Sequence, residues 1–300
     1  MSRLSRSVPA AATAAAFTLT LAACGDAGPA AEDGKISVVA STNVWGSVVE
    51  AVGGDRVSVR ALIDDPSADP HAHPDQPEDA TALAGADLAV YNGGGYDEFF
   101  TELLDATGTD ARKIDAFALS GYADGENEHV WYDLPTVKKV ADRIAADLGS
   151  IDPGRRERFT ANAKTFDTEV DAVAAKAGRI GEDRPGTKVV ATEPVAHYLL
   201  DAAGLTDATP PEFSEAIEEE TDPPVAAVAA TTGLISGRQV ALLVNNAQTE
   251  TPVTDSLGDA ARQAGIPVVT VTETLPAGVT GYVGWMTEQV DALAGALNTA

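Results

Sequence analysis

Histidine is scarce in this chain of 300 residues, and two of its four histidines lie in predicted loops that follow apolar runs. His71 belongs to Asp69-Pro70-His71, and His129 begins the sequence His129-Val130-Trp131-Tyr132-Asp133. The apolar runs are rich in β-branched residues and are typical of buried strands. Neutral imidazoles are common ligands of divalent transition metals. The two loops therefore predict a metal site.

Two glutamates in the second half of the chain occupy comparable positions. Glu193 follows a predicted strand and precedes Pro194, which favours the start of a helix. Glu273 follows the last predicted strand. Because ligands of parallel α/β proteins bind beside the carboxyl ends of strands, we expect each half of the chain to contribute two donors to one cleft. The predicted metal ligands are His71, His129, Glu193 and Glu273, although no zinc-protease, paired-cysteine or EF-hand spacing is present in the sequence.

The elements that must position these donors begin near Lys35. Apolar or alternating runs predict strands at 36–40, 57–63, 87–91 and 112–115. Helical patterns lie between them, around 44–52 and 99–104, and a further helix begins near Pro135. Strands that alternate with helices indicate a parallel sheet covered on both faces.

A long amphipathic segment follows, from Pro153 to about Ile180. Its apolar residues are spaced by threes and fours, which predicts one helix of roughly 40 Å with Asp152 as its N-cap. A helix of this length exceeds the needs of one small lobe, so we interpret it as a rigid strut between two lobes. The residues of its apolar stripe are Phe159, Ala163, Phe166, Val170, Val173, Ala177 and Ile180.

Strand and helix patterns alternate again after residue 183. Strands are predicted at 188–191, 240–244 and 267–271, and helices near 195–203, 225–235, 253–264 and 281–297. The predicted fold class is therefore α/β, with two parallel-sheet lobes joined by a long rigid helix and a cleft between the lobes. The predicted organisation is a lobe over 35–150, a linking helix over 151–182 and a second lobe over 183–300.

The first 24 residues have the pattern of a secretory signal. Arg3 and Arg6 precede a short apolar stretch that ends in Leu21-Ala22-Ala23-Cys24, which resembles a bacterial lipobox. Cys24 is the only cysteine, and lipidation there would remove a reactive thiol from an oxidising environment. Residues 25–34 are small and polar, as expected of a tether. We predict an extracytoplasmic lipoprotein that is anchored to the cell membrane through Cys24.

The chain is strongly acidic, with a formal net charge of −26. This charge argues against binding to nucleic acid and against electrostatic attraction to anionic lipid. It would concentrate cations near the protein, but an acidic surface is also typical of a soluble protein that binds no metal. The charge therefore permits metal binding without indicating it.

Over nearly all of residues 35–300, the chain resembles the metal-binding lipoproteins of ABC-type zinc and manganese importers, known as cluster A-I solute-binding proteins. The resemblance is carried by the loops of His71 and His129, the long helix, and three further sequences: Asn92-Gly93-Gly94-Gly95-Tyr96-Asp97, Glu193-Pro194-Val195-Ala196-His197-Tyr198 and Thr272-Glu273-Thr274. It implies two imidazoles from the first lobe, and a carboxylate or imidazole plus a carboxylate from the second. It also implies capture of a metal rather than catalysis, and delivery to an ABC permease.

The sequence departs from that family at several positions. Asn127-Glu128 stands where the family commonly has Asp-Pro, and His73 replaces an aromatic residue, so His73 is a possible competitor of His71. His197 lies four residues after Glu193, and we interpret it as a surface residue or one that supports a ligand. Glu273 is longer than the aspartate of many relatives, which changes its reach.

Two imidazoles and two carboxylates suit Zn(II), and bidentate carboxylates also accommodate Mn(II). Glu193 replaces a histidine typical of zinc-dedicated members, and the 120–128 loop has no histidine-rich insert, so manganese is slightly favoured. We expect a monomer that closes on the metal with a small rocking motion limited by the long helix.

The sequence leaves two alternative functions open. An extracellular metallohydrolase would need an open metal position and a general base, and no recognisable motif supplies one. A binding protein for a chelated iron ligand would need a cleft rich in arginine or aromatic residues. The predicted cleft loops are poor in arginine, and aromatic residues form only 5% of the chain. An additional adhesive role stays open.

Overall fold

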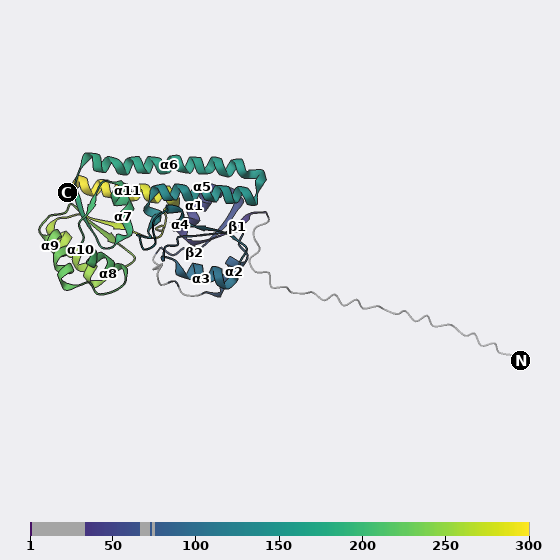
Figure 1. Cartoon of the computed structure of the whole chain (residues 1–300), viewed down its shortest axis with the longest axis horizontal. Coiled ribbons are helices and arrows are strands. Elements are labelled where there is room, and N and C mark those ends of the chain that lie inside the picture. The colour runs from purple at the N-terminus through teal and green to yellow at the C-terminus, as the bar shows by residue number, and fades with distance from the viewer. Residues whose placement is uncertain (2–33, 67–72, 74–75, 300) are drawn as a thin grey trace. The chain divides into compact units, whose positions relative to one another are not determined.

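Two parallel sheets, each of four strands, form the framework of the residues that the computed structural model describes, which are 1, 34–66, 73 and 76–299 (Figure 1). The first sheet has the order β2-β1-β3-β4, with β1 (Ile36–Thr42), β2 (Val57–Ile63), β3 (Leu88–Tyr91) and β4 (Arg112–Asp115). The second has the order β6-β5-β7-β8, with β5 (Lys188–Ala191), β6 (Thr206–Asp207), β7 (Leu243–Asn246) and β8 (Val268–Val271). All six strand pairings are parallel.

The predicted leader, the lipidation site Cys24 and the metal ligand His71 lie outside the described residues. Residues Ala31–Ala300 form one compact unit. The predicted boundaries of tether, lobes and linking helix therefore stay predictions. In the described part of the chain, no helix combines the length and the apolar character that a membrane span requires.

The central strands are buried because helices cover both faces of each sheet. Val38, Val39 and Ala40 of β1 are each at most 2% exposed, as expected of a parallel strand without an open face. The helices of the first lobe are α1 (Asn43–Gly53), α2 (Pro77–Ala84), α3 (Glu98–Thr107), α4 (Ala116–Ser120) and α5 (Leu134–Ile151). Those of the second are α7 (His197–Ala202), α8 (Pro211–Glu218), α9 (Val225–Ser236), α10 (Pro252–Ala264) and α11 (Gly281–Thr299).

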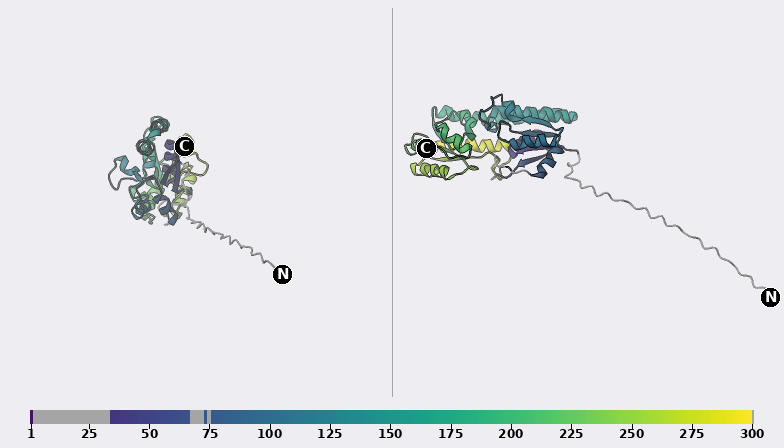
Figure 2. Two further views of the ribbon diagram at one scale, coloured as in Figure 1. Left: turned by 90° about the vertical axis from the view of Figure 1, so that its right-hand side faces the viewer. Right: turned by 60° about the horizontal axis from the view of Figure 1, so that its bottom comes forward.

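The long helix is confirmed as α6 (Arg156–Asp183), of 28 residues. All seven residues of its predicted apolar stripe are buried. It packs against α1 and α5 of the first lobe and against α7 and α11 of the second, and it runs along both lobes in Figures 1 and 2. Asp152 ends α5 rather than capping α6, and its carboxylate lies 3.5 Å from Arg56 Nη2.

Several short elements differ from the sequence-based expectations. The expected strand at 240–244 is β7, which begins at Leu243, and part of the expected helix at 195–203 is a 3₁₀ turn over Pro194–Ala196. α2, α8 and β6 were not predicted. These elements have eight residues or fewer, too few for a clear hydrophobic period.

One apolar cluster runs from the first sheet through α6 into the second sheet and α11. It includes Trp45, Trp131 and Trp285, none more than 1% exposed. Hydrogen bonds join the lobes beside it: Tyr132 Oη donates to Thr272 O at 2.7 Å, and Tyr282 Oη donates to Trp131 O at 2.7 Å. The two lobes therefore share a packed core, which restricts large hinge motions.

Candidate metal site

Glu193 and Glu273 meet at the carboxyl edge of the second sheet. Glu193 lies two residues after β5 and Glu273 two residues after β8, and their side chains are buried. Between them, Asn246 at the end of β7 donates from Nδ2 to Glu193 Oε2 at 2.6 Å and to Glu273 Oε1 at 2.8 Å. The Thr249 hydroxyl donates to the other Glu193 oxygen. The structure therefore brings together the two carboxylates predicted from the second lobe.

His129 is buried in the first lobe, directly before the 3₁₀ turn Val130–Tyr132. Asn127 fixes the ring, because its Oδ1 lies 3.0 Å from His129 Nδ1 and also accepts from the His129 backbone N–H at 2.9 Å. The Asn127 amide reaches the second lobe as well, since its Nδ2 donates to Pro194 O at 2.8 Å. One side chain thus connects the imidazole to the residue that follows Glu193.

The sequence did not identify a third carboxylate, Glu218 at the end of α8. Its Oε1 lies 3.2 Å from His129 Nε2. Glu128, His129 and Glu218 each place a ligand atom within 4.8 Å of the others. Glu218 begins the run Glu218-Glu219-Glu220, which looks like a solvated acidic face in the sequence. The available signal was the i, i+4 pair Phe213 and Ile217, which is buried and predicts an amphipathic helix there.

Burial and mutual repulsion perturb the ionisation of these groups. Burial raises the pKa of Glu193 to about 7, with the charges of Glu218 and Glu273 adding to the effect and two hydrogen bonds opposing it. Burial alone lowers the pKa of His129, but the nearby carboxylates of Glu218, Glu273 and Glu128 raise it to about 9. These groups therefore place buried negative charge near an imidazole. A divalent cation would neutralise the charge of the carboxylates.

The remaining histidines of the described chain have other surroundings. His73 Nε2 lies 2.9 Å from Asp79 Oδ2, and its ring packs 4.6 Å from that of Phe99. His197 is exposed and lies 3.5 Å from Asp201 in the next turn of α7. Nε2 of His73 therefore has Asp79 as its partner. The surroundings of His197 are those of a surface residue.

The glycine-rich loop after β3 is held by a buried carboxylate. Asp97 accepts hydrogen bonds from the backbone N–H groups of Asn92 at 2.7 Å and Gly93 at 2.8 Å. Gly93 has φ of +75°, and a Cβ there would lie 2.3 Å from Asp115 Oδ1, so only glycine fits. Burial raises the pKa of Asp97 to about 6, although these hydrogen bonds oppose the increase.

This pKa predicts a pH dependence of stability. The native protein binds the Asp97 proton more tightly than the unfolded chain, in which an aspartate titrates near pH ~3.9. The contribution of Asp97 to the free energy of unfolding therefore rises by about 1 kcal/mol as the pH falls from about 7.5 to about 5. Urea unfolding of the chelator-treated protein at both pH values would measure it. Asp97→Asn is the control, and an identical pH effect in both proteins would contradict the prediction.

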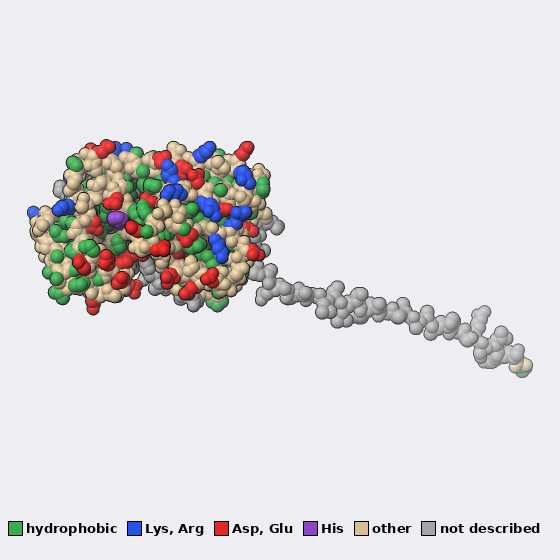
Figure 3. All heavy atoms as spheres, in the orientation of Figure 1, with side chains coloured by type: hydrophobic (Ala, Val, Ile, Leu, Met, Phe, Trp, Pro, Cys, Tyr) green, Lys and Arg blue, Asp and Glu red, His purple; other side chains and the backbone are tan. Residues whose placement is uncertain are grey.

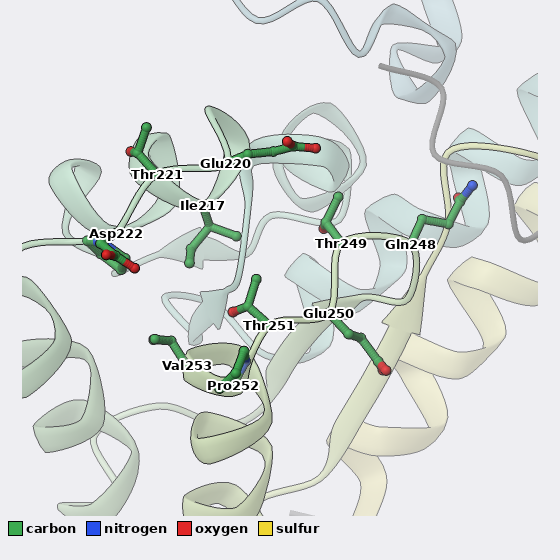
Figure 4. A pocket seen from close by; sticks show the side chains of 11 residues that line it. Ile217, Glu220, Thr221, Asp222, Gln248, Thr249, Glu250, Thr251, Pro252 and Val253 are labelled. Atoms are coloured by element: carbon green, nitrogen blue, oxygen red, sulfur yellow. The ribbon is translucent and has the colours of Figure 1, made fainter. Parts of the chain in front are cut away.

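A cavity of about 530 Å³ lies between the segment after α8 and the loop after β7 (Figure 4). Thr249 and Gln248 line it, and both also contact the cluster: Thr249 through Glu193, and Gln248 Oε1 by accepting from the Glu273 backbone N–H. The cavity is also lined by Glu220, Asp222 and Glu250. It gives the site an acidic neighbourhood on the α8 side.

The fold has two parallel-sheet lobes and a helix that runs along both, with buried carboxylates and an imidazole near the strand ends. These features define a solute-binding protein with a rigid connecting helix. The chain belongs to the family described as "ZnuA: Zinc-uptake complex component A periplasmic", whose model matches residues 38–296. The predicted fold class and family are confirmed.

Curated relatives are similar over part of the chain. A "Manganese ABC transporter substrate-binding lipoprotein PsaA" of Streptococcus anginosus is 28% identical over 208 residues, which are 63% of this chain and 67% of that protein. A "Manganese-binding lipoprotein MntA" of Halalkalibacterium halodurans is 31% identical over 157 residues, covering 50% and 52%. The chain thus matches about two thirds of the first relative and about half of the second.

Solved structures share the fold over nearly their whole length. The periplasmic zinc-binding protein TroA of Treponema pallidum superposes with a TM-score of 0.75 at 20% identity, covering 88% of this chain and 99% of that one. A crystal structure of ZnuA gives a TM-score of 0.74 at 22% identity, with the same coverage.

Proposed function

We propose that this protein captures Mn(II) or Zn(II) outside the cytoplasm and delivers the metal to the permease of an ABC importer. The observation that carries the proposal is the buried pair Glu193 and Glu273, bridged by Asn246 in a chain of the ZnuA family, with the charge of Glu273 acting on the buried His129. The relatives support it, since one is named a manganese ABC transporter lipoprotein and another a manganese-binding lipoprotein. The named relatives are binding proteins, and we propose no catalytic activity.

The proposed ligands are His71, His129, Glu193 and Glu273. Nδ1 of His129 faces Asn127, so Nε2 is the nitrogen that binds metal. Asn246 orients the two glutamates by donating to one oxygen of each, and the Thr249 hydroxyl donates to the other oxygen of Glu193. A metal held between these side chains joins the lobes, and the shared core with α6 limits closure to a small rocking motion.

We further propose that Cys24 carries a lipid that keeps the protein near its permease, as the names of the lipoprotein relatives support. The acidic surface suits a cation-binding protein. Figure 3 shows acidic side chains gathered along the lower edge of the visible face, while lysine and arginine gather over its upper right part. We expect the mature protein to act as a monomer.

The experiment that tests this function is a metal titration of the mature domain after chelation. A ligand that binds only the native state stabilises it by RT ln(1 + [L]/Kd), about 2.7 kcal/mol at 100 times Kd. We expect Mn(II) and Zn(II) to raise the melting temperature of the wild type, and the double variant His71→Ala, Glu273→Ala to lose this response. No stabilisation of the wild type by either metal would refute the proposed function, and an undiminished response in the double variant would refute the ligand assignment.

A further inference from the structure

The geometry around His129 points to a further metal ligand. We propose that Glu218 binds the captured metal directly, and that its carboxylate is the residue that shifts the preference of the site towards Mn(II) over Zn(II). This inference rests on the proposed function and adds to it a carboxylate from α8, outside the ligand set implied by the family resemblance.

The first step is the identity of the free nitrogen of His129. Two backbone groups fix the orientation of the Asn127 amide, because the His129 N–H needs an acceptor and Pro194 O needs a donor. Oδ1 of Asn127 therefore faces His129 Nδ1, which must carry a hydrogen to donate to it. In the neutral ring Nε2 is then the atom with a free lone pair.

The second step is what Nε2 faces. The His129 side chain is fully buried, and Nε2 makes no hydrogen bond of standard geometry to any described residue. It lies 3.2 Å from Glu218 Oε1, in a pair that a proton on the imidazole holds together in the absence of metal and that a bound cation in its place would also bridge. Two donors bound to one metal at about 2.1 Å lie about 3.0–3.4 Å apart for octahedral or tetrahedral angles. The separation is that of two neighbouring ligands around a cation.

The third step is the position of Glu218 relative to the other carboxylates. The charge of Glu218 acts on Glu193 and on His129, and so does the charge of Glu273. α8 is anchored by the buried side chains of Phe213 and Ile217, which fix the helix end that presents Glu218. The charges of Glu218 and Glu273 therefore act on the same buried groups, and Glu218 lies next to His129.

The number of oxygen donors decides the metal preference. Zn(II) is satisfied by four ligands in a tetrahedral arrangement, and a crowding carboxylate adds little to its binding. Mn(II) accepts more ligands and prefers carboxylate oxygen over nitrogen or sulfur. With Glu218, the proposed ligands would include three carboxylates, from Glu193, Glu218 and Glu273. Glu218 therefore supplies the oxygen that distinguishes the two metals.

The test compares Glu218→Gln, Glu218→Asp and wild type, with Glu215→Gln as the matched control. Glu215 is exposed and lies one turn earlier on α8. After chelation, Mn(II) and Zn(II) affinities are measured by competition with a fluorescent chelator. We expect Glu218→Gln to weaken Mn(II) binding about 10- to 100-fold and Zn(II) binding by less than about 3-fold, with Glu215→Gln unchanged. Glu218→Asp keeps the carboxylate, and we expect it to retain part of the Mn(II) affinity.

X-ray absorption of the Mn(II)-loaded protein gives a second readout. We expect one fewer oxygen ligand in Glu218→Gln than in wild type. The role of Glu218 would be overturned if Glu218→Gln lost equal affinity for both metals, or if its affinities equalled those of Glu215→Gln. In either case, metal binding by the wild type would still uphold the proposed function. A larger Mn(II) loss in Glu128→Gln than in Glu218→Gln would overturn it too, by assigning the ligand to the neighbouring carboxylate. A wild type that binds neither metal would instead refute the proposed function itself.

Discussion

Replacement of His129 by alanine is expected to weaken the binding of Mn(II) and Zn(II) by about 100-fold or more. The imidazole is the proposed nitrogen ligand among the described residues, and Asn127 holds its ring so that Nε2 faces Glu218. Removing it takes away the proposed nitrogen ligand and leaves only carboxylates among the described ligands. Even changes beside a metal ligand commonly cost 10- to 100-fold in affinity, so loss of the ligand itself costs at least as much.

The measurement is isothermal titration of the chelator-treated variant, with circular dichroism to verify the native fold. His197→Ala is the matched control, because this histidine is exposed and contacts Asp201 on its own helix. We expect its metal affinity to equal that of the wild type. Wild-type affinity in His129→Ala, or an equal loss in both variants, would show that His129 is not a ligand.

Replacement of Trp285 by alanine is expected to lower the free energy of unfolding by about 3–5 kcal/mol, the usual cost of truncating a large buried aromatic residue. Trp285 of α11 is fully buried, and its ring lies 5.4 Å from that of Tyr132 and 6.2 Å from that of Tyr282. These tyrosines make the hydrogen bonds to Thr272 and Trp131 described above. A cavity at Trp285 therefore weakens the packing of both lobes together.

Urea unfolding of the metal-free protein, followed by far-ultraviolet circular dichroism, measures this cost. The melting temperature should fall by about 10 °C, given about 2–4 °C per kcal/mol for a protein of this size. Val225→Ala is the control, because Val225 is 86% exposed, and a change below about 0.5 kcal/mol is expected there. Loss of less than about 1 kcal/mol in Trp285→Ala would contradict a core shared by the two lobes.

Much of the fold was predictable because its signals are local. The stripe from Phe159 to Ile180 repeats at the helical period, and every member is buried in α6, a helix of 28 residues. Buried parallel strands contain continuous apolar runs, such as 38–40 and 189–191, which the sequence displays directly. Pairing order and register were not predictable, since they depend on contacts between segments far apart in the chain.

The candidate site was predictable only in part. Glu193, Glu273 and His129 were identified because they follow predicted strands and resemble family positions. Glu218 was missed because α8 has only eight residues and because two further glutamates, Glu219 and Glu220, follow Glu218. No local pattern therefore distinguishes Glu218 from surface charge. His73 lies against Asp79, and its competition with His71 for the metal stays a prediction.

The sequence by itself determined the elements and the donor types of this protein, because hydrophobic period, strand ends and the scarcity of histidine are properties of short segments. Only the tertiary structure decided which donors meet and how each is oriented. Asn127 and Asn246 direct the imidazole and the carboxylates through hydrogen bonds that span 67 and 53 residues of chain. Such contacts arise only after the sheets and α6 have packed, since hydrogen-bond partners separated by tens of residues are brought together by the fold and leave no periodic trace in the sequence.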